Sequence, residues 1–472
     1  MTLRTTNMPS PTEELAPKVD PNELPHVPSP YEGQVLKPWQ HFILAAYWFA
    51  STFHWGALLV TMLPAQIAAL DPKHRAETLG LVSGASAIVA LIVPLFFAAL
   101  TDRCASKWGR RRPYMAIGIA INILGLAGMA VSFTAGKPAT AESFPASLFT
   151  SPSLLVFSLA YMVVQFGNNV TSTAYMGVIP DLVPENQRGA ASGWMGLLSQ
   201  LGTLAGAIVI GNVIKEDQIA LQYTAIVAAL LGVGSITLVG MKETPLPVKP
   251  PKIHWPSYLK SLWISPKEYP DFAWVWITRA LVMLGFYAVL PFLNYYLVDV
   301  IGVNQDEVGV EVGKLIALIL VFASFSGIYG GQLSDKIGRK RVVYVANAGI
   351  AVVAIFFIFC QNMTQAMIVG SFFGFFYGAY GSVDYALGTD VLPNKAHAGK
   401  DMAVWHIAMT LPQSFASPIA GALIASFGST TLMHKGEEVV RYTSAGYSAV
   451  FILCSVTFGA GAFLLKNVKG VR

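Results

Sequence analysis

The chain has 472 residues, of which 54% are apolar and only 12% are Asp, Glu, Lys or Arg. Soluble domains carry about 25% charged residues, so this composition excludes a soluble enzyme and a disordered chain. The net charge of +5 is too small to indicate nucleic-acid binding, and the three cysteines lie too far apart for a disulfide framework or a metal cluster. The composition predicts an integral membrane protein, and we expect no cofactor and no bound metal.

Twelve apolar stretches are long enough for helices that cross a bilayer core of about 30 Å. They lack the period-two alternation of a transmembrane barrel. The stretches are residues 39–63, 78–100, 114–135, 154–179, 190–214, 219–240, 272–300, 311–333, 342–360, 366–389, 402–427 and 443–465. The sequence therefore predicts an all-α integral membrane protein with twelve transmembrane helices.

The ends of the chain and its charges predict an orientation. Residues 1–38 contain eight prolines and no apolar core, so we expect a disordered tail and no cleavable signal peptide. Basic residues accumulate on the cytoplasmic side of membrane proteins. With both termini inside, the cytoplasmic segments hold 23 basic residues and the outer loops six, while Arg279 and Lys314 fall within spans. We therefore expect a multi-pass protein of the cell membrane with both termini in the cytoplasm.

The chain divides into two related halves. Residues 241–271 are polar, rich in Pro and Lys, and are expected to form a cytoplasmic linker. It would join six-helix bundles at 39–240 and 272–465, and 466–472 would be a C-terminal tail. Two motifs of the first half recur in the second. Thr101-Asp102-Arg103 and Gly109-Arg110-Arg111-Arg112 correspond to Ser334-Asp335-Lys336 and Gly338-Arg339-Lys340-Arg341. Asp181-Leu182-Val183-Pro184 corresponds to Asp390-Val391-Leu392-Pro393. Two parallel repeats with a site between them are typical of secondary transporters.

These motifs carry a family resemblance. The stretch Gly331 to Lys340, GQLSDKIGRK, resembles the loop signature of the major facilitator superfamily, and both halves carry a copy. The first copy departs from it by Ala98 and by an insertion at 104–108. The resulting string Asp102 to Pro113, DRCASKWGRRRP, is similar to the plant sucrose/proton symporters and their animal relatives, as is Asn168-Asn169 followed twelve residues later by Asp181.

The loop motifs predict a conformational latch. An acidic residue followed by glycine and a basic cluster can hold the bundles together on the cytoplasmic side in one state and release them in another. We assign to this latch Asp102, Arg103, Arg110, Asp181, Arg188, Asp335, Lys336 and Arg339. The alternative is that these side chains are ordinary positive-inside anchors.

Polar residues within spans indicate a substrate path, because they are costly in a bilayer unless they face a cavity or a partner. The resemblance implies that helices 1, 4, 7 and 10 line this path. The candidate substrate-binding residues there are Trp48, Trp55, Gln165, Asn168, Asn169, Tyr287, Asn294, Tyr377 and Tyr380. Amides bind hydroxyl groups and aromatic rings stack on sugars, so this lining suits a neutral polyhydroxylated solute. For each aromatic residue, packing or an interfacial position remains the alternative.

Two charges and one histidine are candidates for coupling. Arg279 in span seven and Asp384 in span ten lie at similar depths, at about 1.5 Å per helical residue. We expect them to face each other, as a structural pair or as a switch linked to protonation. Arg279 could instead snorkel to the interface, with Asp384 contacting water. His54 is expected near mid-membrane, where it could couple protons or simply pack.

The sequence departs from the sucrose symporters in helix four. Their acidic residue and arginine, which are tied to proton coupling and sugar binding, align with Gln165 and Met176 here. The resemblance thus implies a monomeric secondary transporter for a sugar or glycoside. Its transport could be coupled to protons through other residues, coupled to another cation such as sodium, or uncoupled. A sugar facilitator and an exporter of amphipathic compounds remain alternatives. An enzyme is not expected, because the chain has no His-Glu-x-x-His or Gly-x-Ser-x-Gly motif.

Overall fold

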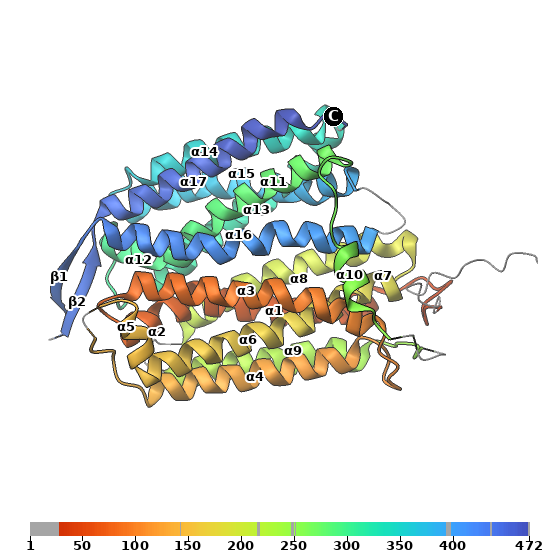
Figure 1. Ribbon diagram of the computed structural model, residues 1–472, viewed down its shortest axis with the longest axis horizontal. Helices are drawn as coiled ribbons and strands as arrows, with labels where there is room; N and C mark the ends of the chain where they lie inside the picture. The colour runs from red at the N-terminus through yellow and green to blue at the C-terminus, as the bar shows by residue number, and fades with distance from the viewer. Residues whose placement is uncertain are drawn as a thin grey trace, which may run out of the picture.

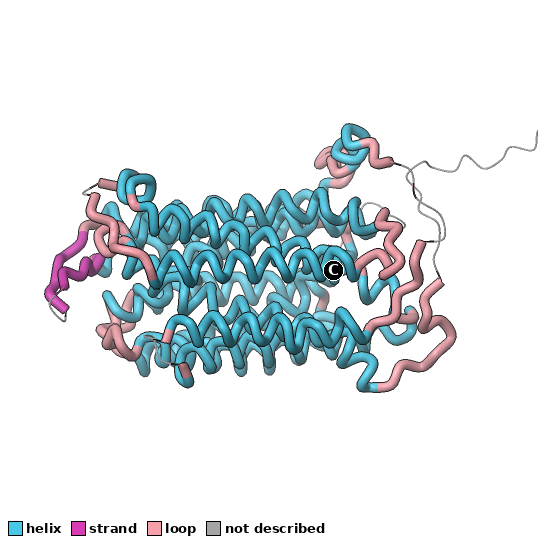
Figure 2. Tube along the Cα trace, turned by 90° about the horizontal axis from the view of Figure 1, so that it is seen from below, coloured by secondary structure: helices cyan, strands magenta, loops and turns pink. Residues whose placement is uncertain are grey.

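The computed structural model describes residues 28–470, except for 142, 215–217, 247–249, 251, 393–397 and 435–436. Long helices form a lower bundle from the first half of the chain and an upper bundle from the second half (Figure 1). Loops and strands gather at the two ends of the helices (Figure 2). We call the end with Pro38 and the C-terminus the terminal end, and the end with the β-hairpin the hairpin end.

The first half of the chain forms the N-terminal bundle. Its elements are α1 (Pro38–Ala57), η1 (Leu58–Met62), α2 (Leu63–Leu70), α3 (Arg75–Asp102), α4 (Arg112–Thr134), α5 (Ala146–Thr150), α6 (Pro152–Met176), α7 (Val178–Leu182), η2 (Glu185–Gln187), α8 (Arg188–Ile208), η3 (Val209–Val213) and α9 (Ile219–Gly240). The elements η1 and η3 are π-helical turns that continue the helices before them.

The second half forms the C-terminal bundle. Helix α10 (Trp255–Ser261) lies between the bundles in sequence. The bundle holds α11 (Pro270–Val289), η4 (Leu290–Phe292), α12 (Leu293–Asp299), α13 (Val308–Ile337), α14 (Arg339–Phe357), α15 (Met363–Asp390), α16 (Ala398–Ser426), α17 (Ser444–Leu464) and η6 (Leu465–Asn467). Strands β1 (Ser429–His434) and β2 (Glu437–Tyr442) pair antiparallel, with Ser429 opposite Tyr442.

Local sequence sets where the helices begin. Proline occupies one of the first two positions of α1, α4, α6 and α11, where its missing N–H would have no partner within the helix. Ser151 caps α6 by accepting from the backbone of Leu154 at 3.4 Å, and Asn362 caps α15 by accepting from Gln365 at 3.0 Å. These caps satisfy donors that a helix leaves unpaired at its first turn.

The predicted membrane spans are present as helices. In the described part of the chain, eleven helices are long and apolar enough to cross a membrane. The first predicted span, 39–63, is not among these eleven but is also helical, because α1, η1 and α2 follow one another without a gap from 38 to 70. The seventh span is interrupted by the 3₁₀ turn at Leu290–Phe292, which contains Pro291.

Part of the predicted N-terminal tail is packed, and this corrects the expectation of disorder for residues 28–37. Tyr31 and Leu36 are buried, and the backbone of Leu36 donates to Gln187 at 2.7 Å. Ser29 donates to the carbonyl of Leu182 at 2.6 Å. The apolar side chains and these hydrogen bonds order the segment against α7 and η2. Residues 1–27 lie outside the described residues.

The two bundles meet closely in the hairpin half of α3 and α16. A Cβ at Gly80 would lie 2.6 Å from the carbonyl oxygen of Ser417, and one at Gly84 would overlap the ring of Pro418. Only glycine permits this approach at both positions. Small residues generally let helix backbones pack closely within a membrane. The hairpin half is therefore a tight interface between the bundles.

Candidate functional site

The amide side chains of α6 form a connected stripe. Gln165 donates to the hydroxyl of Tyr161 at 3.4 Å, and Asn169 donates to the backbone carbonyl of Gln165 at 2.8 Å. Asn168 accepts from Ser51 of α1 at 3.4 Å. Gln165 and Asn168 are buried. The stripe therefore connects helices α1 and α6 through uncharged groups that can exchange hydrogen bonds with a polar solute.

Aromatic rings of α1 flank this stripe. Trp48 stacks on Tyr175 of α6, with ring centroids 5.5 Å apart and an interplanar angle of 12°. Trp55 lies against the ring of His54, at 4.7 Å between centroids. His54 is fully buried, and neither of its ring nitrogens has a hydrogen-bond partner among the described residues. Its coupling role stays a prediction.

The structure places Arg279 of α11 in contact with Asp384 of α15. Arg279 donates from Nη1 to Oδ2 of the carboxylate. Tyr380 donates to the other carboxylate oxygen at 2.8 Å. The Arg279 guanidinium also lies over the ring of Trp405, 4.8 Å from its centroid. Arg279 is therefore held inside the bundle by two kinds of partner, an anion and an aromatic face.

The other aromatic candidates of the C-terminal bundle lie beside this pair. Tyr377 stacks on Phe286 with centroids 4.7 Å apart, and Tyr287 meets the same ring edge-on at 5.3 Å. In the described part of the chain, no hydrogen bond or ion pair between side chains joins these residues to the amide stripe. The candidates thus form two sets, one in each bundle.

Asn294 belongs to neither set. It lies in α12, the last short helix before Asp299, and lines a cavity near the hairpin end. At about 1.5 Å per residue it is only about 8 Å from the end of its helix. Its position is therefore far from mid-membrane.

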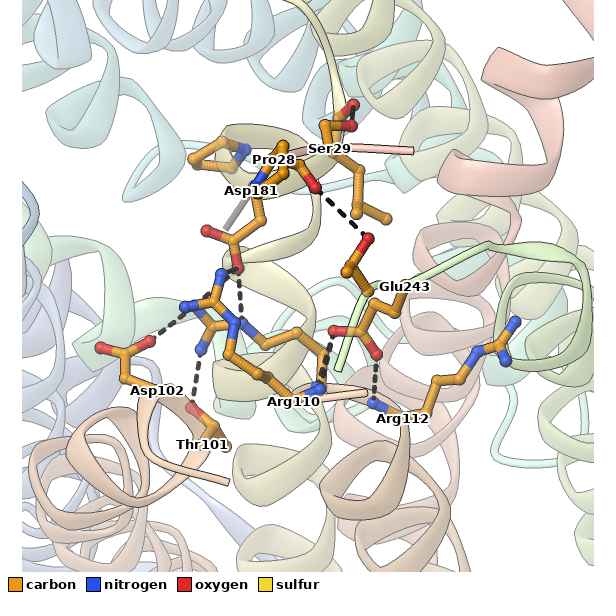
Figure 3. A network of polar contacts seen from close by, with 12 residues as sticks. Pro28, Ser29, Thr101, Asp102, Arg110, Arg112, Asp181 and Glu243 are labelled. Atoms are coloured by element: carbon orange, nitrogen blue, oxygen red, sulfur yellow. Dashed lines mark hydrogen bonds and ion pairs between the residues drawn. The ribbon is translucent and has the colours of Figure 1, made fainter. Parts of the chain in front are cut away.

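At the terminal end, arginines and acids form one network, the arginine cluster of Asp102, Arg110, Arg111, Asp181 and Glu243 (Figure 3). Arg111 is its centre: Nη2 lies 2.6 Å from Asp102, and Nε donates to Asp181 at 2.9 Å. Arg110 reaches the same Asp181 oxygen at 2.9 Å. Burial would lower the pKa of Arg111, but Asp102 and Asp181 raise that pKa above its ordinary value, so the side chain stays charged.

Glu243 closes the cluster from the linker. Its carboxylate accepts from the backbone N–H groups of Arg110, Arg111 and Arg112, at 3.2, 2.8 and 3.2 Å. These donors lie at the start of α4, where a helix favours an anion. Gly109, with φ of +102°, leaves the space that Glu243 fills. Burial raises the pKa of the Glu243 carboxyl, while the N–H donors and arginines counter it.

The second half repeats one pair of this network. Arg339 lies 2.5 Å from Asp390, as Arg110 lies near Asp181 in the first half. Both arginines directly follow a glycine with positive φ, Gly109 or Gly338. The internal repeat thus produces the same ion pair between equivalent loops.

The remaining latch candidates lie near these pairs. Arg188 donates to the carbonyl of Pro180 at 2.9 Å. Arg103 directly follows Asp102 at the end of α3, and Asp335 and Lys336 are exposed at the end of α13. The ion pairs of the latch candidates Arg110 and Asp102 lie within the N-terminal bundle and that of Arg339 within the C-terminal bundle, so they brace each bundle in this state. Whether they rearrange between states stays a prediction.

Gly177→Ala will destabilise the protein strongly, because the new Cβ would overlap the Arg111 guanidinium. Displacing Arg111 takes its buried guanidinium away from Asp102 and Asp181, whose side chains are 40% and 22% exposed, and the loss of such charged hydrogen bonds costs about 1.5–3 kcal/mol. The backbone at Gly177 is already helical, with φ of −77° and ψ of −13°, so backbone strain is not the cause. Thermal unfolding followed by size-exclusion chromatography will measure the loss. The matched control is Gly189→Ala, which meets nothing within 4 Å; an equal loss there would contradict the prediction.

Sequence reasoning missed an ion pair at the hairpin end. Arg75 of α3 donates from Nη2 to both carboxylate oxygens of Asp299, at 2.6 and 2.7 Å, and the two side chains are 3% and 0% exposed. Tyr447 donates to Asp299 at 2.6 Å, and Tyr442 of the hairpin donates to Glu77 at 3.0 Å. The signal in the sequence was weak, since Arg75 and Asp299 each lie at the end of a span.

Comparison with known proteins identifies the family. The profile of the Major Facilitator Superfamily matches residues 41–336 and again 275–469. The chain belongs to the major facilitator superfamily. Members of this superfamily are transporters rather than enzymes. Solved structures of transporters share the fold of this chain. The structure of nucleoside transporter NupG aligns with 91% of this chain over 98% of its own length, with a TM-score of 0.60 and 12% sequence identity. The structure of a D-xylose-proton symporter aligns with 89% of this chain over 97% of its own length, with a TM-score of 0.62 and 15% sequence identity.

Curated relatives match this superfamily member over shorter stretches. Multidrug resistance protein MdtG of Proteus mirabilis is 28% identical over 26% of this chain and 30% of its own length. Sucrose transport protein SUC3 of Arabidopsis thaliana is 27% identical over 33% of this chain and 27% of its own. MdtG of Salmonella arizonae is 24% identical over 44% of this chain and 49% of its own. The chain therefore matches less than half the length of each of these relatives.

Proposed function

We propose that this protein moves a neutral polyhydroxylated solute, a sugar or glycoside, across the cell membrane by alternating access of its two bundles, coupled to a cation, most simply a proton. The observation that carries the proposal is the uncharged stripe of Gln165, Asn168 and Asn169 beside the stacked rings of Trp48 and Tyr175. Amides match hydroxyl groups in both donors and acceptors, and flat rings match the C–H faces of a sugar. A charged solute would find no counter-ion on this stripe.

Coupling would reside in the other bundle. A buried carboxylate that contacts both a guanidinium and a hydroxyl, as Asp384 does with Arg279 and Tyr380, can accept a proton only if its partners rearrange. Trp405 supplies Arg279 with a second partner for that state. The proton would then change the contacts between α11 and α15, and these helices face the substrate path in the proposed mechanism.

The same proposal assigns an orientation and a monomeric state. The excess of basic residues in the loops of the terminal end supports a cytoplasmic position for that end. The hairpin end is then outside, and the tight contact of α3 with α16 there corresponds to a state that is closed to the outside. The match to a sucrose transport protein and the fold shared with a D-xylose-proton symporter are consistent with the substrate class.

The test is uptake by purified protein in liposomes. Labelled monosaccharides and disaccharides are offered with and without an imposed pH or sodium gradient. Accumulation driven by the pH gradient supports proton symport. Accumulation driven by the sodium gradient instead would show that sodium is the coupling ion. Equilibration that ignores every gradient indicates a facilitator. If no sugar accumulates or exchanges under any gradient, the sugar proposal is wrong.

A second candidate function is export of amphipathic compounds. It is favoured by the relatives named multidrug resistance proteins, and an aromatic lining would also suit such compounds. The same liposomes, loaded with an amphipathic dye such as ethidium, test it. Dye movement driven by a proton gradient, together with failure of every sugar, would support export over sugar transport.

Asn168→Ala will raise the KM for the transported sugar without loss of folded protein. A neutral hydrogen bond contributes about 0.5–1.5 kcal/mol, which corresponds to roughly two- to tenfold in affinity. Initial rates in liposomes against sugar concentration will measure it. The control is Ser158→Ala on the same helix, where the hydroxyl donates to the backbone carbonyl of Leu154, four residues earlier in that helix. An unchanged KM in Asn168→Ala would remove Asn168 from the site.

A further inference from the structure

A polar cavity lies between the bundles near the hairpin end, apart from the amide stripe. Its volume is about 200 Å³. The residues that matter here are Thr61, Gln66, Arg75, Gln222, Asn294 and Tyr295, which come from η1, α2, α3, α9 and α12. Figure 1 shows α2 and α12 near each other at this end. The cavity is thus shared between the two bundles.

Four buried polar atoms of this lining have no hydrogen-bond partner in the described part of the chain. They are Oγ1 of Thr61, Nε2 of Gln66, Nε of Arg75 and Nδ2 of Asn294. Their residues are 5%, 2%, 3% and 5% exposed. An unsatisfied buried polar group costs about 1–3 kcal/mol. These four atoms are themselves shielded, but their residues line the cavity, so a small rotation of each side chain would let an occupant with hydrogen-bond acceptors satisfy them.

The donors select the chemistry of the occupant. Three of the four atoms are N–H donors, and the acceptor of Gln66 is already used by the Tyr223 hydroxyl at 2.6 Å. The charge of Arg75 is neutralised by Asp299, and among the described residues that line the cavity Arg75 is the only charged one. An anion would therefore lack a free counter-charge. A neutral molecule with several oxygen acceptors matches the site.

Size and shape narrow the class further. The volume of about 200 Å³ is many times the roughly 10–15 Å³ of such space that one water needs, so the cavity has room for several waters or one molecule the size of a monosaccharide. Apolar groups, including Phe133 and the ring of Tyr295, form the rest of the wall. A sugar has both a hydroxyl edge and an apolar face, so it would use the donors and the rings together.

The helices around the cavity are irregular. Thr61 lies in the π-helical turn Leu58–Met62, and such turns occur frequently at functional sites. The next residues include Pro64, whose carbonyl accepts from the Tyr295 hydroxyl of the other bundle at 2.8 Å. Arg75 belongs both to the cavity wall and to the ion pair that joins the bundles. An occupant would therefore touch the contacts that close the hairpin end.

We propose that this cavity is a second binding site for one neutral, monosaccharide-sized polyhydroxylated molecule, occupied at the hairpin end before or after the molecule reaches the central path. The class of ligand rests on the proposed function, but the site itself rests on the cavity and its unpartnered donors. Asn294, which the sequence assigns to the central path, then acts in this outer site.

The test is protection of a thiol at the cavity. In a variant whose three native cysteines, Cys104, Cys360 and Cys454, are replaced by alanine, Ala65→Cys puts a thiol in the cavity wall. Its modification by 2-aminoethyl methanethiosulfonate is timed with glucose or sucrose present. At a sugar concentration ten times its Kd, the rate should fall about tenfold, because only the empty site reacts.

Two further variants decide where the sugar acts. Thr61→Val with Asn294→Leu removes two unpartnered polar groups while leaving the Gln66–Tyr223 bond, and should abolish protection. Asn168→Ala, in the central stripe, should leave protection intact. If the double variant does not fold, Thr61→Val alone takes its place in the test, and it is expected to weaken the protection by sugar. Protection that survives the double variant, or disappears in Asn168→Ala, overturns the proposal.

Failure of the outer site and failure of the proposed function give different results. Sugar transport in liposomes without any protection overturns the outer site alone and leaves a cavity that holds water. Protection without transport supports the outer site and overturns sugar transport. Absence of both overturns both proposals.

Discussion

Replacing Asp384 by asparagine will abolish gradient-driven accumulation of the substrate. An amide cannot bind and release a proton, so a cycle that needs protonation of this group stops. The change also leaves Arg279 without its carboxylate, and breaking a buried pair costs about 3–5 kcal/mol. Uptake in liposomes under a pH gradient, with thermal unfolding of the same preparation, will measure both effects. Exchange of labelled for unlabelled substrate, which needs no net proton movement, should persist in protein that remains folded.

A double variant separates coupling from stability. Arg279→Gln with Asp384→Asn removes both charges and should recover most of the stability that either single change loses, because no unpaired charge remains. Accumulation should not return in the double variant if Asp384 carries the proton. If Asp384→Asn leaves both folding and accumulation intact, the coupling role is wrong. If the double variant restores accumulation, the pair is structural.

The pairing of Arg279 with Asp384 illustrates what the sequence can predict. Apolar length defines the spans, and the rise of a helix per residue then gives the depth of each charge. Two charges of opposite sign at similar depth have a strong reason to meet, because each is costly alone in a membrane. The repeated loop motif likewise anticipates equivalent loops, and the pairs Arg110–Asp181 and Arg339–Asp390 occupy them.

Other features depend on where distant segments meet. Arg75 and Asp299 are 224 residues apart, and nothing local to either residue indicates its partner. Arg111 rather than Arg110 is the centre of the arginine cluster, and the run of three arginines after Gly109 does not show which of them reaches both Asp102 and Asp181. Glu243 reads as part of a polar linker, and only the fold brings it to the start of α4.

Composition can also mislead over a short range. The many prolines of residues 1–38 indicate disorder, yet Tyr31 and Leu36 bury apolar side chains near the terminal end of the N-terminal bundle. Asn294 shows a similar limit, since its place near the end of a span does not show that α2, α3 and α9 surround it with a cavity. In both cases tertiary contacts decide what local composition leaves open.

Arg75→Gln will shift the protein toward a state that is open at the hairpin end. The ion pair with Asp299 joins the two bundles and is almost completely buried. Breaking such a pair costs about 3–5 kcal/mol, and a loss of about 3 kcal/mol in the closed state alone changes the ratio of states more than 100-fold. Asp299 keeps the donors from Tyr447 and the backbone of Tyr442, so the C-terminal bundle should remain folded.

Spin labels on opposite bundles can measure this opening. Lys137→Cys and Asn304→Cys, both at exposed positions of the hairpin end, are labelled in the variant without native cysteines, and the distance between the labels should lengthen in Arg75→Gln. The control is Lys314→Gln, which removes the ion pair with Glu311 within a single helix, where Lys314 is 51% exposed. An exposed pair contributes about 0–1 kcal/mol, so this distance should not change. Identical distances in Arg75→Gln and in the parent protein would mean that helix packing at Gly80 and Gly84 closes this end without the ion pair.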